Sequence, residues 1–232
     1  MGYKIRRSHE RKFFDHGWLK TFHTFSFASY FDPNFMGFRK LRVINEDTIG
    51  PGEGFPSHEH NDMEIVTIVL EGGLAHRDST GTESTIHAGE IQAMSAGSGI
   101  THSEYNASDS QPAHFPQIWI QPDAKGIKPG YQQETKLPST PNQWKLLVSK
   151  EGKERSLKIH QDVNLSLLNL EKGHQTEKKV PPNRYGWLQV IDGELSMNGD
   201  TLRKGDGVAI DPDTTFTLKA ITPTKILFFD LN

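Results

Sequence analysis

Residues 52–73 read GEGFPSHEHNDMEIVTIVLEGG, and no other stretch of the chain says as much about its architecture. At its centre lies His58-Glu-His60, followed by the apolar run 65–70 and a glycine turn. Residues two apart on a β-strand point to the same face, so the two imidazoles would lie side by side. The stretch therefore predicts a strand with a pair of potential metal ligands, then a buried strand and a tight turn.

A second stretch repeats the same spacing. Residues 94–106 read MSAGSGITHSEYN and contain His102-Ser-Glu104 behind a glycine-rich turn. If the two strands meet across a sheet, His58, His60, His102 and Glu104 would surround one ion with three imidazoles and a carboxylate. This donor set suits Fe, Mn, Ni, Co, Cu or Zn.

Composition narrows the class of protein. The chain has 232 residues, no cysteine and a net charge of -3, with 21 glycines and 13 prolines. The absence of cysteine excludes disulfides and thiolate-based zinc sites. The charge gives no case for nucleic-acid binding, and no apolar run is long enough for a transmembrane helix. We therefore expect a cytoplasmic protein with no membrane and no direct nucleic-acid partner.

Short apolar runs separated by turn residues predict an all-β chain. The runs lie at 41–44, 65–70, 90–94, 115–120, 144–148, 157–159, 163–170, 185–191, 207–210, 215–218 and 225–231. A polar, proline-bearing stretch predicts a connector at 126–143. It divides the chain into an N-terminal lobe at 1–125 and a C-terminal lobe at 144–232.

A faint internal repeat links the two lobes. Val69-Leu-Glu-Gly72 resembles Val190-Ile-Asp-Gly193, and Ala88-Gly-Glu90 resembles Lys204-Gly-Asp206. When His58, His60 and His102 are shifted by the offsets between these glycines, they land on Lys179, Pro181 and Leu218. A duplicated second lobe would therefore lack the metal ligands.

The two histidine stretches resemble the two motifs of the cupin superfamily. Gly52, His58, His60 and Glu64 match the first motif, and the second is matched with Ser95 in place of the usual proline and a spacing two residues longer. The segments HGW at 16–18, TFHTFSF at 21–27 and FMGF at 35–38 are similar to the start of the pirin family. This similarity covers about residues 9–120, and the remainder loosely resembles the second, degenerate cupin lobe of bacterial pirin-like proteins.

The resemblance implies a bicupin, with two β-sandwich or barrel (jelly-roll) lobes in one chain. It also implies that the metal ligands are His58, His60, His102 and Glu104, with Fe(II) the expected metal and Mn, Ni, Co, Cu or Zn as alternatives. Glu64 would orient a ligand imidazole or pair with a nearby basic group on the sheet face.

Other residues near the motifs receive more ordinary interpretations. Phe55 and Met94 are expected at the pocket wall. Histidines outside the two motifs, His76 among them, are expected to be ordinary surface or hydrogen-bonded residues. Most rings of the aromatic segment are expected to fill the core; they are Phe22, Phe25, Phe27, Tyr30, Phe31, Phe35 and Phe38.

The resemblance also implies a function. Bacterial pirin-like proteins are linked to quercetin 2,3-dioxygenase activity, so we expect an enzyme that cleaves a flavonol with O2 and releases CO, with Glu104 as general base. The alternative is a metal- or redox-sensing regulatory protein that binds a transcription factor or metabolic enzyme. An isomerase or another small-molecule cupin enzyme is a third reading, because a fold does not fix a function.

Overall fold

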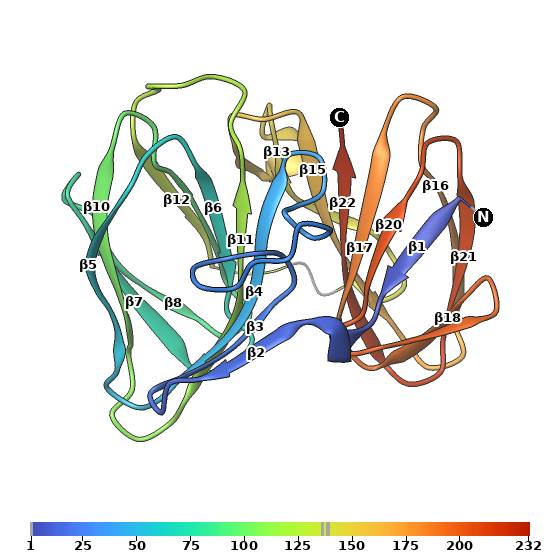
Figure 1. Cartoon of the computed structure of the whole chain (residues 1–232), viewed down its shortest axis with the longest axis horizontal. Coiled ribbons are helices and arrows are strands. Elements are labelled where there is room, and N and C mark those ends of the chain that lie inside the picture. Colours follow the sequence, from blue (N-terminus) through green and yellow to red (C-terminus); the bar gives the residue numbers. More distant parts are fainter. Residues whose placement is uncertain (1, 136, 138–139) are drawn as a thin grey trace. The chain divides into compact units, whose positions relative to one another are not determined.

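The computed structural model describes residues 2–135, 137 and 140–232, and nearly all of its regular structure is β-strand (Figure 1). The chain forms two compact units. The N-terminal unit comprises Lys12–Leu137 and Leu157–Gln161, and the C-terminal unit comprises Met1–Arg11, Pro138–Ser156 and Asp162–Asn232. The predicted all-β architecture with two lobes is confirmed. Within the described residues, no helix has the length and apolarity to cross a membrane.

The N-terminal unit is built from two antiparallel sheets. The larger has the strand order β12-β9-β6-β11-β4-β3-β2, and the smaller has the order β5-β10-β7-β8. The strands of this unit are β2 (Lys12–Asp15), β3 (Leu19–His23), β4 (Leu41–Ile49), β5 (Gly54–His60), β6 (Glu64–Ile68), β7 (Gly73–Asp78), β8 (Glu83–His87), β9 (Ile91–Ser95), β10 (Ile100–Asn106), β11 (Ala113–Ile120), β12 (Gly130–Glu134) and β14 (Leu157–Lys158).

Apolar side chains from both sheets of the N-terminal unit pack together in its core. Ile49 on β4 and Phe115 on β11 of the larger sheet meet Leu74 on β7 and Ile86 on β8 of the smaller sheet, and all four are fully buried. Burial of this apolar surface is what holds the two sheets face to face.

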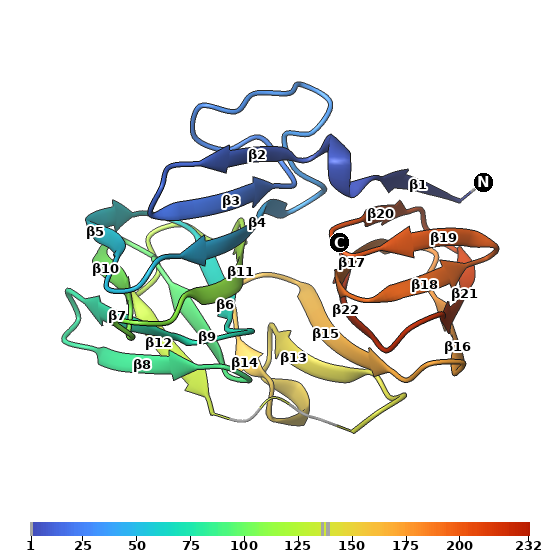
Figure 2. The ribbon, with the colours of Figure 1, turned by 90° about the horizontal axis from the view of Figure 1, so that it is seen from below.

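The C-terminal unit has the same plan, which Figure 2 shows from a second direction. The strands of this unit follow the order β1-β20-β17-β22-β15-β13 in one sheet and β16-β21-β18-β19 in the other. Its elements are β1 (Tyr3–Arg6), η1 (Ser8–Glu10), β13 (Lys145–Ser149), η2 (Lys153–Arg155), β15 (Val163–Leu170), β16 (Gln175–Lys179), β17 (Tyr185–Asp192), β18 (Glu194–Met197), β19 (Asp200–Arg203), β20 (Gly207–Ile210), β21 (Thr215–Ala220) and β22 (Thr224–Leu231).

The strand orders reveal a duplication. The run β9-β6-β11-β4 of one unit corresponds to β20-β17-β22-β15 of the other, and β5-β10-β7-β8 corresponds to β16-β21-β18-β19. The repeat glycines occupy equivalent turns, because Gly72 precedes β7 with φ 73° and Gly193 precedes β18 with φ 83°. A Cβ at either position would collide with a proline carbonyl, that of Pro112 or Pro223, so both turns require glycine.

Two pairings join segments that local sequence patterns do not connect. The sequence predicts a connector at 126–143, but Gly130–Glu134 forms the edge strand β12, which pairs with β9. The sequence also places the first residues in the N-terminal lobe, whereas β1 pairs with β20 of the C-terminal unit. Such edge pairings depend on backbone groups that a distant strand leaves unpaired.

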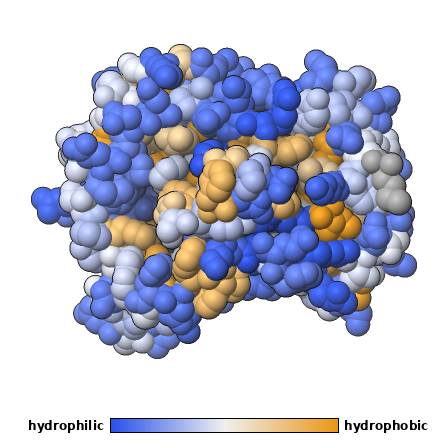
Figure 3. Space-filling model, viewed as in Figure 1, coloured by the Kyte–Doolittle hydropathy of each residue, from blue (hydrophilic) through white to orange (hydrophobic). Residues whose placement is uncertain are grey.

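The aromatic segment differs from its expected placement in the core. Of the seven rings, only Phe25 is fully buried, while Phe31 is 71% exposed. Figure 3 shows hydrophobic groups on an otherwise mostly hydrophilic face, where the connection between β3 and β4 lies in Figure 1. In this connection the described β-bridges are isolated ones, such as Phe27 with Tyr30, and several of its rings are only half-buried.

The core of the N-terminal unit yields a stability prediction. We expect Phe115→Ala to lower the free energy of unfolding by about 3–5 kcal/mol, because it removes a fully buried ring and leaves a cavity. Phe31→Ala is the matched control and should change it by less than about 0.5 kcal/mol. Urea unfolding monitored by circular dichroism measures both, and equal effects would contradict this assignment of the core.

Candidate metal centre and adjoining pocket

Strands β5 and β10 bring three imidazoles together. In their antiparallel register His102 lies opposite His58, and Ile100 lies opposite His60. The ring centroid of His58 is 4.4 Å from that of His102 and 4.8 Å from that of His60, and the centroids of His60 and His102 are 4.9 Å apart. One ring nitrogen from each residue lies within 4.8 Å of the others, close enough to surround a single ion.

An irregularity in β5 shapes this cluster. Between His102 and Glu104, β10 advances two residues while β5 advances three, from His58 to Phe55. Pro56 lies in this bulge, where its missing N–H breaks no regular ladder bond. A Cβ at Gly54 would collide with the backbone of Glu104, so glycine permits the close approach of the two strands.

The carboxylate of Glu104 is fixed from the opposite sheet. Gln92 on β9 donates its Nε2–H to Oε1 at 2.9 Å, and Gln117 on β11 donates its Nε2–H to Oε2 at 2.7 Å. Burial raises the pKa of Glu104, while nearby His76 and the two amide donors act in the opposite direction. The carboxylate is therefore held in one orientation at the buried end of the cluster.

Two of the imidazoles are in the neutral form that a metal requires, and the third is oriented by a hydrogen bond. The Nδ1–H of His58 donates to the carbonyl of Pro56 at 2.8 Å, so Nε2 is the nitrogen that could bind a metal. Burial and the neighbouring imidazoles lower the pKa of His60 to about 4 and that of His102 to about 3, so both are neutral at neutral pH. Both ring nitrogens of His102 are buried without a hydrogen-bond partner among the described residues. Such orphaned nitrogens, with a carboxylate beside them, fit a divalent transition metal.

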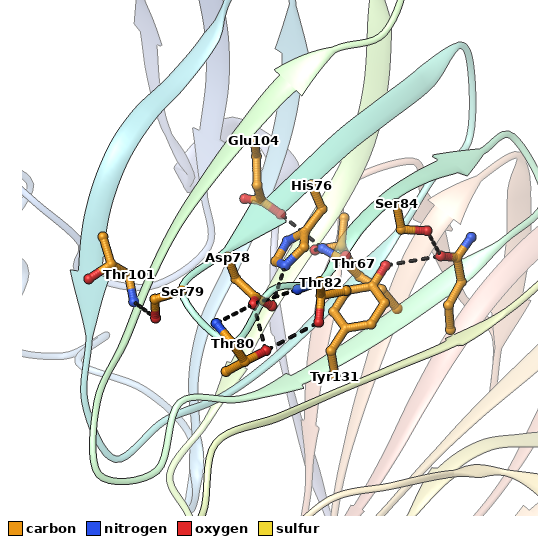
Figure 4. Close-up of polar contacts among 12 residues, drawn as sticks. Thr67, His76, Asp78, Ser79, Thr80, Thr82, Ser84, Thr101, Glu104 and Tyr131 are labelled. Atoms are coloured by element: carbon orange, nitrogen blue, oxygen red, sulfur yellow. Dashed lines mark hydrogen bonds and ion pairs between the residues drawn. The ribbon is translucent and has the colours of Figure 1, made fainter.

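His76 joins the cluster from β7, contrary to its expected role as an ordinary histidine. It lies opposite Glu104 in the register of β7 with β10. Its Nε2–H donates to Oδ2 of Asp78 at 3.0 Å, so Nδ1 is left as a buried acceptor that has no partner among the described residues (Figure 4). His76, His102 and Glu104 offer ligand atoms within 4.8 Å of one another. The sequence contains one indication that His76 belongs to the site, because His76-Arg-Asp78 has the same spacing as His58-Glu-His60 and His102-Ser-Glu104.

Asp78 is anchored by the turn that follows β7. Its Oδ1 accepts the backbone N–H of Thr80 at 2.8 Å, the hydroxyl of Thr80 at 2.6 Å and the backbone N–H of Thr82 at 3.2 Å (Figure 4). The other oxygen remains for His76. This arrangement fixes both the orientation and the tautomer of the imidazole.

A pocket of about 330 Å³ adjoins the imidazole cluster. The rings of Phe27, Phe55 and Trp119 supply its apolar wall, and His58 and His60 reach it from β5. The polar part of its lining comprises Asn45, Asp47, Ser57, Glu104 and Gln117. This volume is within the range of small-molecule sites, roughly 300–1000 Å³.

Of the two residues expected at the pocket wall, one lines the pocket and the other does not. Phe55 lines the pocket, with its ring 6.3 Å from that of His58. Met94 does not line it, because it is fully buried in a cluster with Ile65, Ala96 and Ile100.

Asp47 is a pocket residue that sequence reasoning missed. It lies on β4 and is almost fully buried. Burial raises its pKa to about 7, and the charge of the nearby Glu104 carboxylate adds to this shift. Its position on the wall depends on β4 pairing with β11, which the local sequence does not reveal.

Glu64 is fully buried but does not contact the ligand imidazoles. It accepts a hydrogen bond from the Ser95 hydroxyl at 2.7 Å, and its other oxygen is 3.3 Å from Nδ1 of His160. His160 belongs to the short segment Leu157–Gln161, which is part of the N-terminal unit. The contacts thus match the reading of Glu64 as a carboxylate paired with a basic group.

Known proteins are similar to nearly the whole chain. The family model described as Pirin matches residues 4–120, and the one described as Quercetinase C-terminal cupin domain matches residues 146–231. A quercetin 2,3-dioxygenase of Escherichia coli K12 is 45% identical over 98% of this chain and 97% of its own. A pirin-like protein of Caulobacter vibrioides is 38% identical over 93% of this chain and 94% of its own.

A solved structure is also similar to this chain along nearly its whole length. The crystal structure of the bacterial pirin YhhW from Escherichia coli in complex with nickel(II) has a TM-score of 0.94 and 44% identity, and the match covers 99% of this chain and 98% of that one. The shared fold, the paired histidine strands and the identity along the full length lead to one conclusion: this chain belongs to the pirin family and is a bicupin.

Proposed function

We propose that this protein is a metal-dependent dioxygenase that cleaves a flavonol such as quercetin with O2 and releases CO. The observation that carries the proposal is the cluster of His58, His60 and His102, whose ligand atoms gather beside an aromatic-walled pocket. The quercetin 2,3-dioxygenase of Escherichia coli, similar along nearly its whole length, supports the substrate class.

His58, His60, His102 and Glu104 would hold the metal, for which we propose Fe(II). The metal supplies a Lewis acid that favours the ionised form of the flavonol 3-hydroxyl. Three imidazoles and one carboxylate would leave one or two positions for substrate on a metal that accepts five or six ligands.

Glu104 is the proposed general base. Its buried carboxylate has a raised pKa, which increases its affinity for the proton of the flavonol 3-hydroxyl. Gln92 and Gln117 hold its two oxygens in place before and after the transfer, so little reorganisation is needed.

The aromatic rings of the pocket wall support a flat, apolar substrate. The ring of Trp119 is 5.1 Å from that of Phe27 and 4.8 Å from that of His60, in both cases nearly perpendicular. These rings bury the apolar body of the substrate and keep water from its reactive ring.

The first test is turnover itself. Metal-free protein reloaded anaerobically with Fe(II) should consume O2 and release CO in the presence of quercetin, and His60→Ala should abolish both because it removes a ligand. If Fe(II) is confirmed bound and no CO appears, the dioxygenase proposal is wrong and the regulatory alternative becomes the one to pursue.

Glu104→Gln tests the base. We expect it to retain much of the metal, measured by mass spectrometry of the bound ion, and to lose about 10²–10⁴-fold in turnover. Glu59→Gln, an exposed neighbour on β5, is the control and should turn over normally. Full activity of Glu104→Gln would contradict the role of Glu104 as base.

Metal removal should lower thermal stability, because a ligand that binds only the folded state stabilises that state. With free metal at about 100 times its dissociation constant, the gain is about 2.7 kcal/mol. We expect differential scanning fluorimetry to show a concentration-dependent rise in Tm for the wild type and for His174→Ala, whose side chain is 54% exposed. The rise should be lost in His60→Ala, and an equal rise in that variant would place the metal elsewhere.

A further inference from the structure

The C-terminal unit places a lysine where the N-terminal unit places its metal-competent imidazoles. Strand β16 is the counterpart of β5, since each is the first strand of a sheet with the same order. On β16, Lys178 pairs with Phe216, which is a member of the buried core cluster of this unit. Paired residues share a face of the sheet, so Lys178 points to the interior of the unit.

The Lys178 ammonium is enclosed by aromatic rings. Its Nζ is 4.5 Å from the ring centroid of Trp144 and 4.7 Å from that of Phe228. Burial lowers the pKa of Lys178, and the carboxylate of Asp230 opposes this shift. Among the described residues Lys178 makes no ion pair, whereas its neighbour Lys179 pairs with Asp213 at 2.8 Å.

Lys178 also lines a cavity of about 340 Å³, together with Trp144 and Phe228. The indole Nε1–H of Trp144 is buried and has no hydrogen-bond partner in the described chain. Asn164 and Ser166 line the same cavity from β15, and neither side chain makes a hydrogen bond to another described residue. A buried donor without an acceptor costs free energy, so this cavity lacks an acceptor that a ligand would supply.

Two acidic residues, Asp230 and Glu154, line the cavity, and their negative charges would oppose the binding of an anion unless they are neutralised or exposed to solvent. Oδ1 of Asp230 accepts the Nε–H of Arg184 at 2.7 Å, so much of its charge is already neutralised. Glu154 is exposed to solvent, and Lys153, which also lines the cavity, pairs with Glu151 at 3.4 Å.

We propose that the C-terminal unit binds a small organic carboxylate in this cavity. The Lys178 ammonium and the Trp144 indole N–H hold the carboxylate, Asn164 and Ser166 offer further hydrogen bonds, and Phe228 packs against the apolar body. In the N-terminal unit the corresponding region has imidazoles suited to a metal cation. In the C-terminal unit the Lys178 side chain itself supplies the positive charge. This site is separate from the proposed dioxygenase centre and does not depend on its activity.

Benzoate is the test probe, and benzamide, the neutral molecule of nearly the same shape, is its control. Isothermal titration of the full-length protein should give a dissociation constant on the order of 1 mM for benzoate and much weaker binding of benzamide. The same titration with His60→Ala separates this cavity from the metal centre, and benzoate binding should be unchanged.

Two variants test the assigned donors. Lys178→Met keeps the apolar stem and should weaken benzoate binding by at least about tenfold, while Lys179→Met, which alters the exposed neighbour, should not. Trp144→Phe replaces the indole with a phenyl ring, which removes the N–H donor, and should also weaken benzoate binding. Circular dichroism shows whether each variant folds, and Trp144→Phe tests the site on its own if Lys178→Met does not fold. The proposal is overturned if the wild type does not prefer benzoate to benzamide, if His60→Ala abolishes binding, or if folded Lys178→Met and Trp144→Phe bind as the wild type does.

Discussion

The antiparallel pairing of β10 with β5 on one side and with β7 on the other is the constraint on which the candidate metal centre depends. It sets His102 opposite His58 and Glu104 opposite His76, so side chains from three strands face the same interior space. A shift of one residue would turn the ligands of β10 to the opposite face. The bulge at Pro56 and the close approach at Gly54 belong to this register.

The second sheet completes the centre. Gln92 and Gln117 reach across from β9 and β11 to hold both oxygens of Glu104. A carboxylate buried between sheets is costly unless it is hydrogen-bonded or beside a cation. The neutral imidazoles and the anchored carboxylate form a donor set that a divalent metal satisfies, which links the chemistry of the centre to the packing of the fold.

The two units show how one strand order can enclose different interiors. In the N-terminal unit the inward positions of β5 and β10 carry His58, His60, His102 and Glu104. In the C-terminal unit the corresponding strands carry Phe216 and Leu218 in an apolar core, with Lys178 at the edge of a separate cavity. The backbone plan was kept while the inward side chains changed, as expected when function depends on sites rather than on the fold.

The sequence by itself determined the features that follow from local periodicity. Alternation and turn glycines predicted the strands, and the spacing of His58, His60, His102 and Glu104 predicted which side chains share a face. Only the tertiary structure decided which distant side chains meet these residues. His76, Gln92, Gln117 and Asp47 reach the site from other strands, and Met94 is covered by its neighbours despite its closeness in sequence. The physical reason is that strand pairing and sheet packing join residues through backbone hydrogen bonds and apolar burial, and the partner in each contact lies far away in the chain.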